Sequence, residues 1–189
     1  VAEEAAIARD EGAGFAAIAR TNDELTLLQA AMTTRGVAYR KTDGRSIFDC
    51  PEVQACAAVL RLLVKPASND LDVVLAWAGM EVEDTRKIRK LFGVNIMIGS
   101  RDDFMNNGIS EKGIEIWRTF AKRYAGWATA KEQGFHATLC FGVHEWLSET
   151  LQKPNNQAIL DAAREIYKPN DCTLEEQLAN VRAREEKQK

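Results

Sequence analysis

The chain of 189 residues has a formal net charge of −3, and 46% of its residues are hydrophobic while 28% are charged. This composition is ordinary for a soluble globular protein. The slight negative charge excludes the global basic field of a dedicated nucleic-acid binder, though not a local group of cations. No apolar run approaches the roughly 18 residues that a membrane-spanning helix needs, and no signal-peptide pattern is present, so we expect a cytoplasmic protein.

Residues 1–49 predict a short helix followed by a strand–helix–strand unit. Residues 2–11 place apolar and acidic side chains at helical spacing, and residues 15–19 form a small apolar run that suits a buried strand. Asn22 has the character of an N-cap for an amphipathic helix that Gly36 ends, and residues 37–39 predict a second strand. This order is typical of a βαβ unit, in which ligands gather at the carboxyl ends of the strands.

Beyond Pro51 nearly every apolar position recurs at helical spacing, so the rest of the chain predicts a helical domain. The first expected helix begins at Pro51, and the second begins at a cap formed by Asn69 or Asp70. Five more helices are expected at residues 83–91, 110–131, 135–151, 155–167 and 173–187. The predicted fold class is mostly α with a small α/β portion, divided into residues 1–49 and residues 50–189. Because two strands cannot bury both faces of a sheet, the α/β portion is expected to belong to a larger sheet.

Few residues are candidates for catalysis by this chain alone. A phosphate-binding loop needs Gly-x-x-x-x-Gly-Lys-Ser/Thr, and the chain contains no Gly-Lys dipeptide, so we expect no ATP hydrolysis. His136 and His144 lie eight residues apart, whereas zincin-type ligands need a spacing of four, so core or surface roles are favoured and no metal site is expected. The scattered cysteines lack a Cys-x-x-Cys pair and are interpreted as reduced thiols.

The helix expected at residues 83–91 begins with acids and continues with four bases, which are Arg86, Lys87, Arg89 and Lys90. This order matches the helix macrodipole, which is the interpretation that we favour. The alternative is a basic face that contacts a nucleic-acid backbone.

The four tryptophans lie at helical spacing among aliphatic residues. Core packing is favoured over a base-stacking platform for Trp117, Trp127 and Trp146. The role of Trp77, which is close to Gly79, stays open.

The tripeptide Arg20-Thr21-Asn22 is the strongest candidate for a binding site, because it stands where the first expected strand ends. In one interpretation Arg20 is an ordinary residue at a strand end and Asn22 caps the helix. In the other, Arg20 pairs with a phosphate oxygen while Thr21 or Asn22 donates to a neighbouring phosphate or base. The residues alone do not decide between the two.

An ordered series of motifs resembles the UvrD/Rep family of superfamily 1 DNA helicases. In that family a strand ends in Tyr-Arg-Thr/Ser-Asn, and a Pro-Tyr-Arg strand and a Gly-Gly turn follow. The series continues with Phe-Phe-x-Arg-x-Glu-Ile, a helix similar to Ala-Tyr-Leu-Arg-Leu, and Asn-Pro-x-Asp-Asp. The similar stretches here, in the same order, are Ala19-Arg20-Thr21-Asn22, Val37-Ala38-Tyr39-Arg40, Asp43-Gly44, Ile47-Phe48-Asp49-Cys50-Pro51-Glu52-Val53, Ala58-Val59-Leu60-Arg61-Leu62-Leu63 and Lys65-Pro66-Ala67-Ser68-Asn69-Asp70.

The resemblance implies that residues 1–49 are part of the second RecA-like motor domain, 2A, and that residues 50–189 are its helical insert, 2B. It implies contact with single-stranded DNA by Arg20, Thr21 and Asn22, extended to Arg45 and Ser46. The partners implied are single-stranded DNA and the remaining helicase domains of a longer parent. ATP and Mg²⁺ are implied for that parent and no cofactor for this chain, which lacks both halves of the family's ATP site.

The alternative function is a non-catalytic helical module that binds other proteins and is derived from a helicase. The family's duplex-contacting hairpin would fall near residues 78–83, where Glu81 and Glu83 would repel phosphate. Asp43 likewise replaces the first glycine of the Gly-Gly turn. These acids favour the interaction module and argue against binding of duplex DNA.

Overall fold

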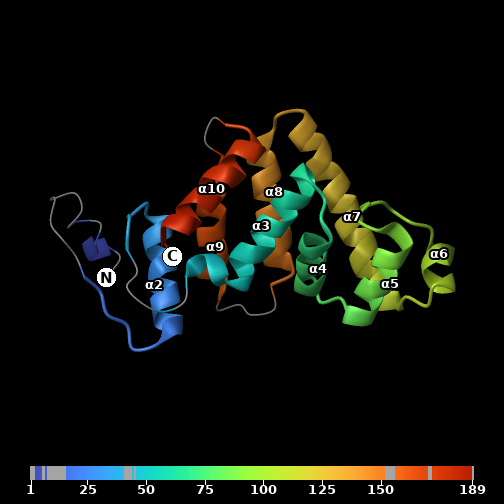
Figure 1. The fold of residues 1–189 in the computed structure, drawn as a ribbon, viewed down its shortest axis with the longest axis horizontal. Helices are drawn as coiled ribbons and strands as arrows, with labels where there is room; N and C mark the ends of the chain where they lie inside the picture. The colour runs from blue at the N-terminus through green and yellow to red at the C-terminus, as the bar shows by residue number, and fades with distance from the viewer. Residues whose placement is uncertain are drawn as a thin grey trace.

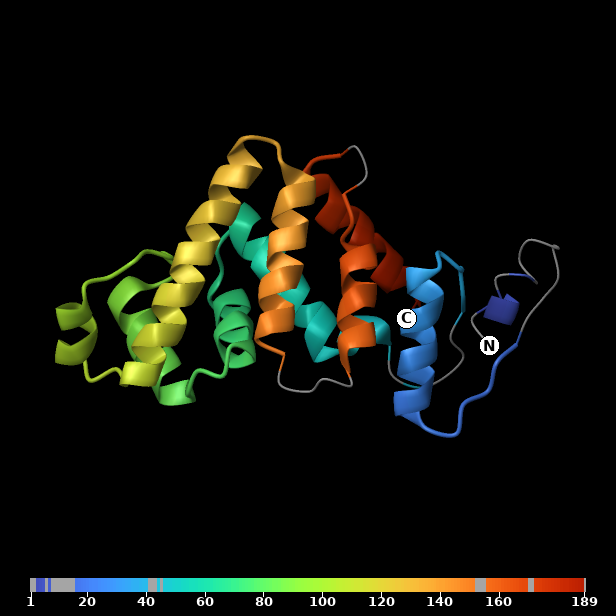
Figure 2. The same ribbon diagram turned by 180° about the vertical axis from the view of Figure 1, so that it is seen from behind.

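The computed structural model describes residues 3–5, 7, 16–40, 44, 46–151, 156–169 and 172–188, and the account below concerns these residues. Figures 1 and 2 show an elongated helical protein in which α2 and α6 lie toward opposite ends. The helices are α2 (Asn22–Thr34), the 3₁₀-helix η1 (Ile47–Asp49), α3 (Pro51–Val64), α4 (Ser68–Trp77), α5 (Val82–Phe92), α6 (Arg101–Asn106), α7 (Glu111–Glu132), α8 (His136–Glu149), α9 (Gln157–Ile166) and α10 (Leu174–Gln188).

The described residues contain no β-strand, so the predicted βαβ unit, and with it the partial RecA-like fold of residues 1–49, is wrong. Residues 16–19 have no regular structure, and Ile18 is 99% exposed, whereas a buried strand would cover it. The mostly α part of the prediction agrees with the structure. Of the helix expected at residues 2–11, the described residues 3–5 and 7 are helical.

Val37 is buried because it completes the end of α2, not because it belongs to a strand. The Val37 N–H donates to the Met32 carbonyl at 2.9 Å, and the Gly36 N–H donates to the Thr33 carbonyl at 3.0 Å. Gly36 has φ of 63°, the left-handed conformation that this Schellman motif requires. The motif places the residue after the glycine against the last helical turn, and Val37 and Met32 share one buried cluster. The predicted end of α2 at Gly36 is confirmed.

Helix α3 forms the centre of the core. Ten of its 14 residues are buried, as expected for a helix that is apolar nearly all round. It contacts η1, α4, α7, α8, α9 and α10, and Figure 1 shows it running among them. Helix α2 packs against α9, which connects the N-terminal part of the chain to this core.

Helix α7 satisfies the carboxyl end of α3. The hydroxyl of Tyr124 donates to the Leu62 carbonyl at 2.8 Å, and the ammonium group of Lys131 donates to the Leu63 carbonyl at 3.0 Å. The last carbonyls of a helix lack intrahelical donors and carry partial negative charge, so a cation is favourable there. Lys131 also pairs with Glu175 of α10 at 3.0 Å, which ties three helices together.

An aromatic cluster fills the space between α7 and α8. Phe120 is fully buried, and its ring centroid lies 5.5 to 6.4 Å from those of four aromatic residues, which are Trp117, Tyr124, Trp127 and Trp146. Offset and edge-to-face aromatic pairs at such distances add to the stabilisation from burial. The predicted core positions of Trp117, Trp127 and Trp146 are confirmed.

Most helix boundaries agree with the prediction, and two local features differ. Helix α4 begins after Ala67 without a side-chain cap, so the predicted capping by Asn69 or Asp70 is wrong, and Asp70 instead pairs with Arg61 at 2.7 Å. Helix α6 was not predicted, because six residues are too few to give a periodic signal. Its N-cap is Ser100, whose side chain accepts the N–H of Asp103.

Candidate functional site

The predicted tripeptide lies at the amino terminus of α2. Thr21 is the N-cap, because its Oγ1 accepts the Glu24 N–H at 3.2 Å while Glu24 Oε2 accepts the Thr21 N–H at 3.3 Å. The Arg20 N–H donates to the same carboxylate oxygen at 2.9 Å. The prediction that Asn22 is the N-cap is therefore wrong. Three amides at this helix start are satisfied within the chain.

The side chains of the tripeptide are nevertheless open to solvent. Arg20, Thr21 and Asn22 are all exposed, and the Arg20 guanidinium has no hydrogen bond or ion pair with another described residue. A Cβ built on Gly44 would lie 2.9 Å from Asn22 Oδ1, so the turn at Gly44 lies directly beside the tripeptide. An unpaired guanidinium at the surface can form the charge-assisted hydrogen bonds that a phosphate accepts.

The structure separates Ser46 from this exposed surface. Ser46 is 4% exposed and caps η1, because its Oγ accepts the Phe48 N–H at 3.4 Å and its N–H donates to Asp49 Oδ2 at 3.1 Å. Its hydroxyl thus serves the local fold. Arg45, the other residue to which DNA contact was extended, lies outside the described residues.

The bases of α5 are largely engaged within the chain. Three of the four bind neighbours, through Arg86 to Glu83 at 2.9 Å, Arg89 to Asp72 at 2.7 Å, and Lys87 Nζ to the Gly108 carbonyl at 2.6 Å. Lys90 is exposed and has no partner among the described residues. The first turn holds acids and the last turn holds bases, as the macrodipole favours. This arrangement supports the structural interpretation of α5 over a phosphate-binding face.

The histidines do not converge on a common site. His144 Nε2 lies 3.1 Å from Asp161 Oδ1, which joins α8 to α9. His136 stands at the first position of α8, two turns from His144. Within the described ranges, no three His, Cys, Asp or Glu side chains are grouped so as to hold a metal ion.

The surroundings of Cys56 and Cys140 favour the neutral form of both thiols. Burial raises the pKa of Cys140 to about 11 and raises the pKa of Cys56 further, where nearby Cys140 adds to the effect. The Cys140 thiol donates to the Tyr167 carbonyl at 3.5 Å. All four cysteines of the chain have free thiols. Because the thiolate is the nucleophile, Cys56 and Cys140 are suited to packing, not to catalysis.

A cavity that sequence reasoning missed lies between α3, α4 and the chain that follows α8. Its volume is about 420 Å³, within the range of small-molecule sites. Ten described residues line it, namely Pro51, Glu52, Gln54, Ala55, Val73, Ala76, Trp77, Thr150, Leu151 and Asn156. They come from three segments that are far apart in the sequence, so no local sequence motif indicates the cavity. The one hint was Trp77, whose role the sequence left open.

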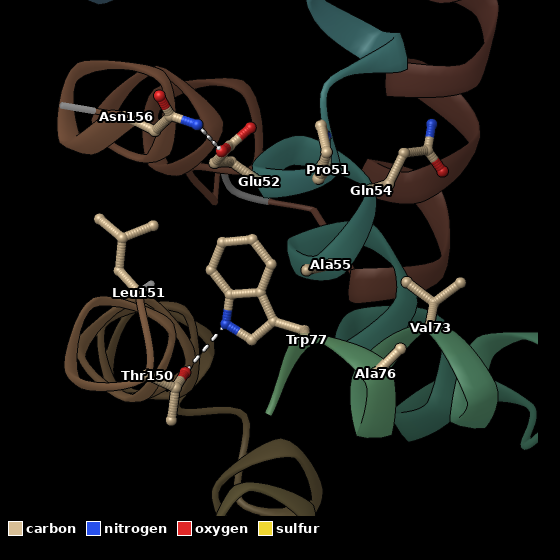
Figure 3. Close-up of a pocket in the computed structure, with 10 residues that line it drawn as sticks. All are labelled: Pro51, Glu52, Gln54, Ala55, Val73, Ala76, Trp77, Thr150, Leu151 and Asn156. Atoms are coloured by element: carbon tan, nitrogen blue, oxygen red, sulfur yellow. Dashed lines mark hydrogen bonds between the residues drawn. The ribbon is translucent and has the colours of Figure 1, made fainter. Parts of the chain in front are cut away.

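Trp77 and Glu52 are the principal groups of this cavity. Trp77 is partly buried, and its Nε1–H donates to Thr150 Oγ1 at 2.9 Å. Figure 3 shows the indole reaching toward Thr150 and Leu151, with Glu52 and Asn156 close to each other beyond the ring. Glu52 is 3% exposed, and its Oε1 accepts a hydrogen bond from the Asn156 amide at 2.5 Å. The second oxygen, Oε2, is buried without a partner among the described residues.

Comparisons with protein-family models, with curated proteins and with solved structures find no match for this chain. Among the helices of the described residues, none combines the length and apolarity required to cross a membrane.

Proposed function

We propose that the chain is a non-catalytic helical part of a UvrD/Rep-like DNA helicase, which contacts single-stranded DNA through Arg20, Thr21 and Asn22. The observation that carries the proposal is the unpaired, exposed guanidinium of Arg20 at the start of α2. Arginine is the residue best suited to bidentate contact with a phosphate. The proposal takes the helicase resemblance from the ordered motifs, and it does not include a RecA-like fold for residues 1–49.

Two features of the tripeptide support a contact to the nucleic-acid backbone. The capping box fixes the backbone of Arg20 and Thr21, so the Arg20 side chain starts from a defined position. Asn22 lies beside the Gly44 turn and can donate to an adjacent phosphate or base.

In the parent protein, ATP and Mg²⁺ would be held by the remaining helicase domains. A cytoplasmic location and no ATP turnover by this chain, with or without single-stranded DNA, belong to the same proposal.

The test is equilibrium binding of a fluorescein-labelled oligothymidine, measured by anisotropy for the native chain, Arg20→Ala and Arg35→Ala. Arg35 is a matched control because it is exposed at the opposite end of the same helix and its substitution changes the net charge equally. Loss of one charge-assisted phosphate contact costs roughly 1.5 kcal/mol, so Arg20→Ala should weaken binding about tenfold. Arg35→Ala should leave the affinity within twofold. Equal weakening by both variants would refute a local contact.

A second candidate function is a module that binds other proteins and has no DNA contact. The specific observation in its favour is Glu24, whose carboxylate lies against the backbone of Arg20 and Thr21, where an approaching phosphate would meet its negative charge. If the oligonucleotide binds neither the native chain nor Arg20→Ala in a salt-dependent way, this second function replaces the first.

A further inference from the structure

We propose that the cavity between α3, α4 and the chain after α8 is a binding site for a small organic cation, an ammonium group attached to an aromatic or aliphatic body. The inference does not depend on DNA contact. It rests on the composition of the cavity wall, on the buried carboxylate of Glu52, which has no ion pair with another described residue, and on the indole of Trp77.

The charge of the described wall is complementary to a cation. The described residues that line the cavity include one acid, Glu52, and no lysine, arginine or histidine. The amide of Asn156 already donates to Glu52 Oε1, and the indole N–H of Trp77 already donates to Thr150. Thr150 in turn donates to the Trp146 carbonyl at 2.8 Å. The formal charge that the described wall presents to a ligand is the negative charge of Glu52, so phosphates and carboxylates are disfavoured.

A cation would satisfy the wall in two ways. Glu52 is almost fully buried and its hydrogen-bond partner is the neutral amide of Asn156, so its charge has no cationic partner among the described residues, and an ammonium group in the cavity would lower the cost of burying it. The ring face of Trp77 attracts cations through its quadrupole, and Trp77 and Glu52 line the same cavity. An aromatic wall beside an acid is a general arrangement for recognising amines.

The remaining wall favours an apolar body on the ligand. Ala55, Val73, Ala76 and Leu151 present aliphatic carbon, and the volume of about 420 Å³ suits a small molecule. Burial of that body against aliphatic side chains gives affinity, while Glu52 and Trp77 set the preference for positive charge. The inference therefore predicts selection by charge among ligands that share the same apolar body.

Three probes that share a phenethyl group and differ in charge test the selection, namely phenethylamine, 2-phenylethanol and 3-phenylpropionate. Each is titrated into the full ¹⁵N-labelled chain while the indole N–H signals are followed by NMR, and Trp77→Phe assigns the Trp77 signal. Phenethylamine should shift that signal saturably, with a dissociation constant in the millimolar range or tighter. The alcohol and the acid should bind at least tenfold more weakly.

Variants distinguish the contribution of the Glu52 carboxylate to ligand binding from that of the other residues that line the cavity. Glu52→Gln should weaken phenethylamine at least tenfold and leave 2-phenylethanol unchanged, whereas the control Glu132→Gln, at an exposed position on α7, should change neither. Ala76→Leu, which fills the cavity from an exposed helical position, should weaken both probes without depending on Glu52. Equal binding of amine and alcohol, an unaltered amine affinity in Glu52→Gln, or no saturable shift with any probe would overturn the proposal.

Discussion

Gly113 in the first turn of α7 allows a prediction that runs against helix propensity. Replacing glycine by alanine inside a helix ordinarily stabilises it by about 1 kcal/mol. At Gly113, however, an added Cβ would lie 2.5 Å from Asp84 Oδ2 and 3.1 Å from Ile109 Cγ2. Asp84 is 5% exposed, and its carboxylate accepts the Ser110 N–H at 3.1 Å and the Ser110 hydroxyl. Gly113→Ala must therefore displace a buried carboxylate from its donors.

The magnitude follows from the bonds that would be strained. Each hydrogen bond to a charged group contributes about 1.5 to 3 kcal/mol, so weakening two of them outweighs the gain in propensity and leaves a net loss of roughly 1 to 2 kcal/mol. Gly126 on the same helix is a matched control, because it is exposed and an added Cβ would meet nothing within 4 Å. Gly126→Ala should raise the free energy of unfolding by about 1 kcal/mol.

Chemical denaturation of the native chain and of both variants measures this contrast. In a chain of this size, a change of 1 kcal/mol in the free energy of unfolding shifts the thermal midpoint by about 2 to 4 °C. Thermal unfolding should therefore show a lower midpoint for Gly113→Ala and a higher one for Gly126→Ala. Equal stabilisation by the two substitutions would refute the tight packing of α7 on Asp84.

Two further predictions concern the core. Phe120→Ala removes the ring shared by four aromatic neighbours and should lower the free energy of unfolding by about 3 to 5 kcal/mol in urea denaturation; a loss below about 1 kcal/mol would contradict the packing. Burial raises the pKa of Cys140 to about 11, so its alkylation by iodoacetamide, followed by mass spectrometry, should be slower than that of glutathione at pH 8. The rate should rise about tenfold per pH unit until the thiol ionises near pH 11, and a plateau below pH 9 would contradict the burial.

Helices were predictable from sequence wherever the apolar period was long. Helix α7 shows the period over six turns, and it agrees with the expected helix at residues 110–131 to within one residue at each end. The prediction of strands at residues 15–19 and 37–39 was wrong. A short apolar run shows no periodicity, so the sequence does not distinguish a strand from another segment with apolar side chains. Val37 is apolar because a Schellman motif needs a hydrophobic residue after Gly36, and this local requirement resembles a strand in the sequence.

The candidate site was predictable only where its residues are contiguous. Arg20, Thr21 and Asn22 are neighbours in the chain, so their common exposure follows from the start of one helix. Ser46 is buried through contacts that only the folded chain makes, since the Ile47 N–H that follows it donates to Gln29 of α2. Glu52 had the ordinary sequence character of an acid in a first helical turn, and tertiary packing buries it beside Trp77 and Asn156.

The salt dependence of single-stranded DNA binding tests the central claim most directly. Each phosphate neutralised on a single strand contributes about 0.7 to the slope of log affinity against log salt concentration. If Arg20 contacts a phosphate, Arg20→Ala should flatten the slope by about 0.7 relative to the native chain, while Arg35→Ala should leave it unchanged. Identical slopes for the native chain and Arg20→Ala would contradict a phosphate contact at the start of α2.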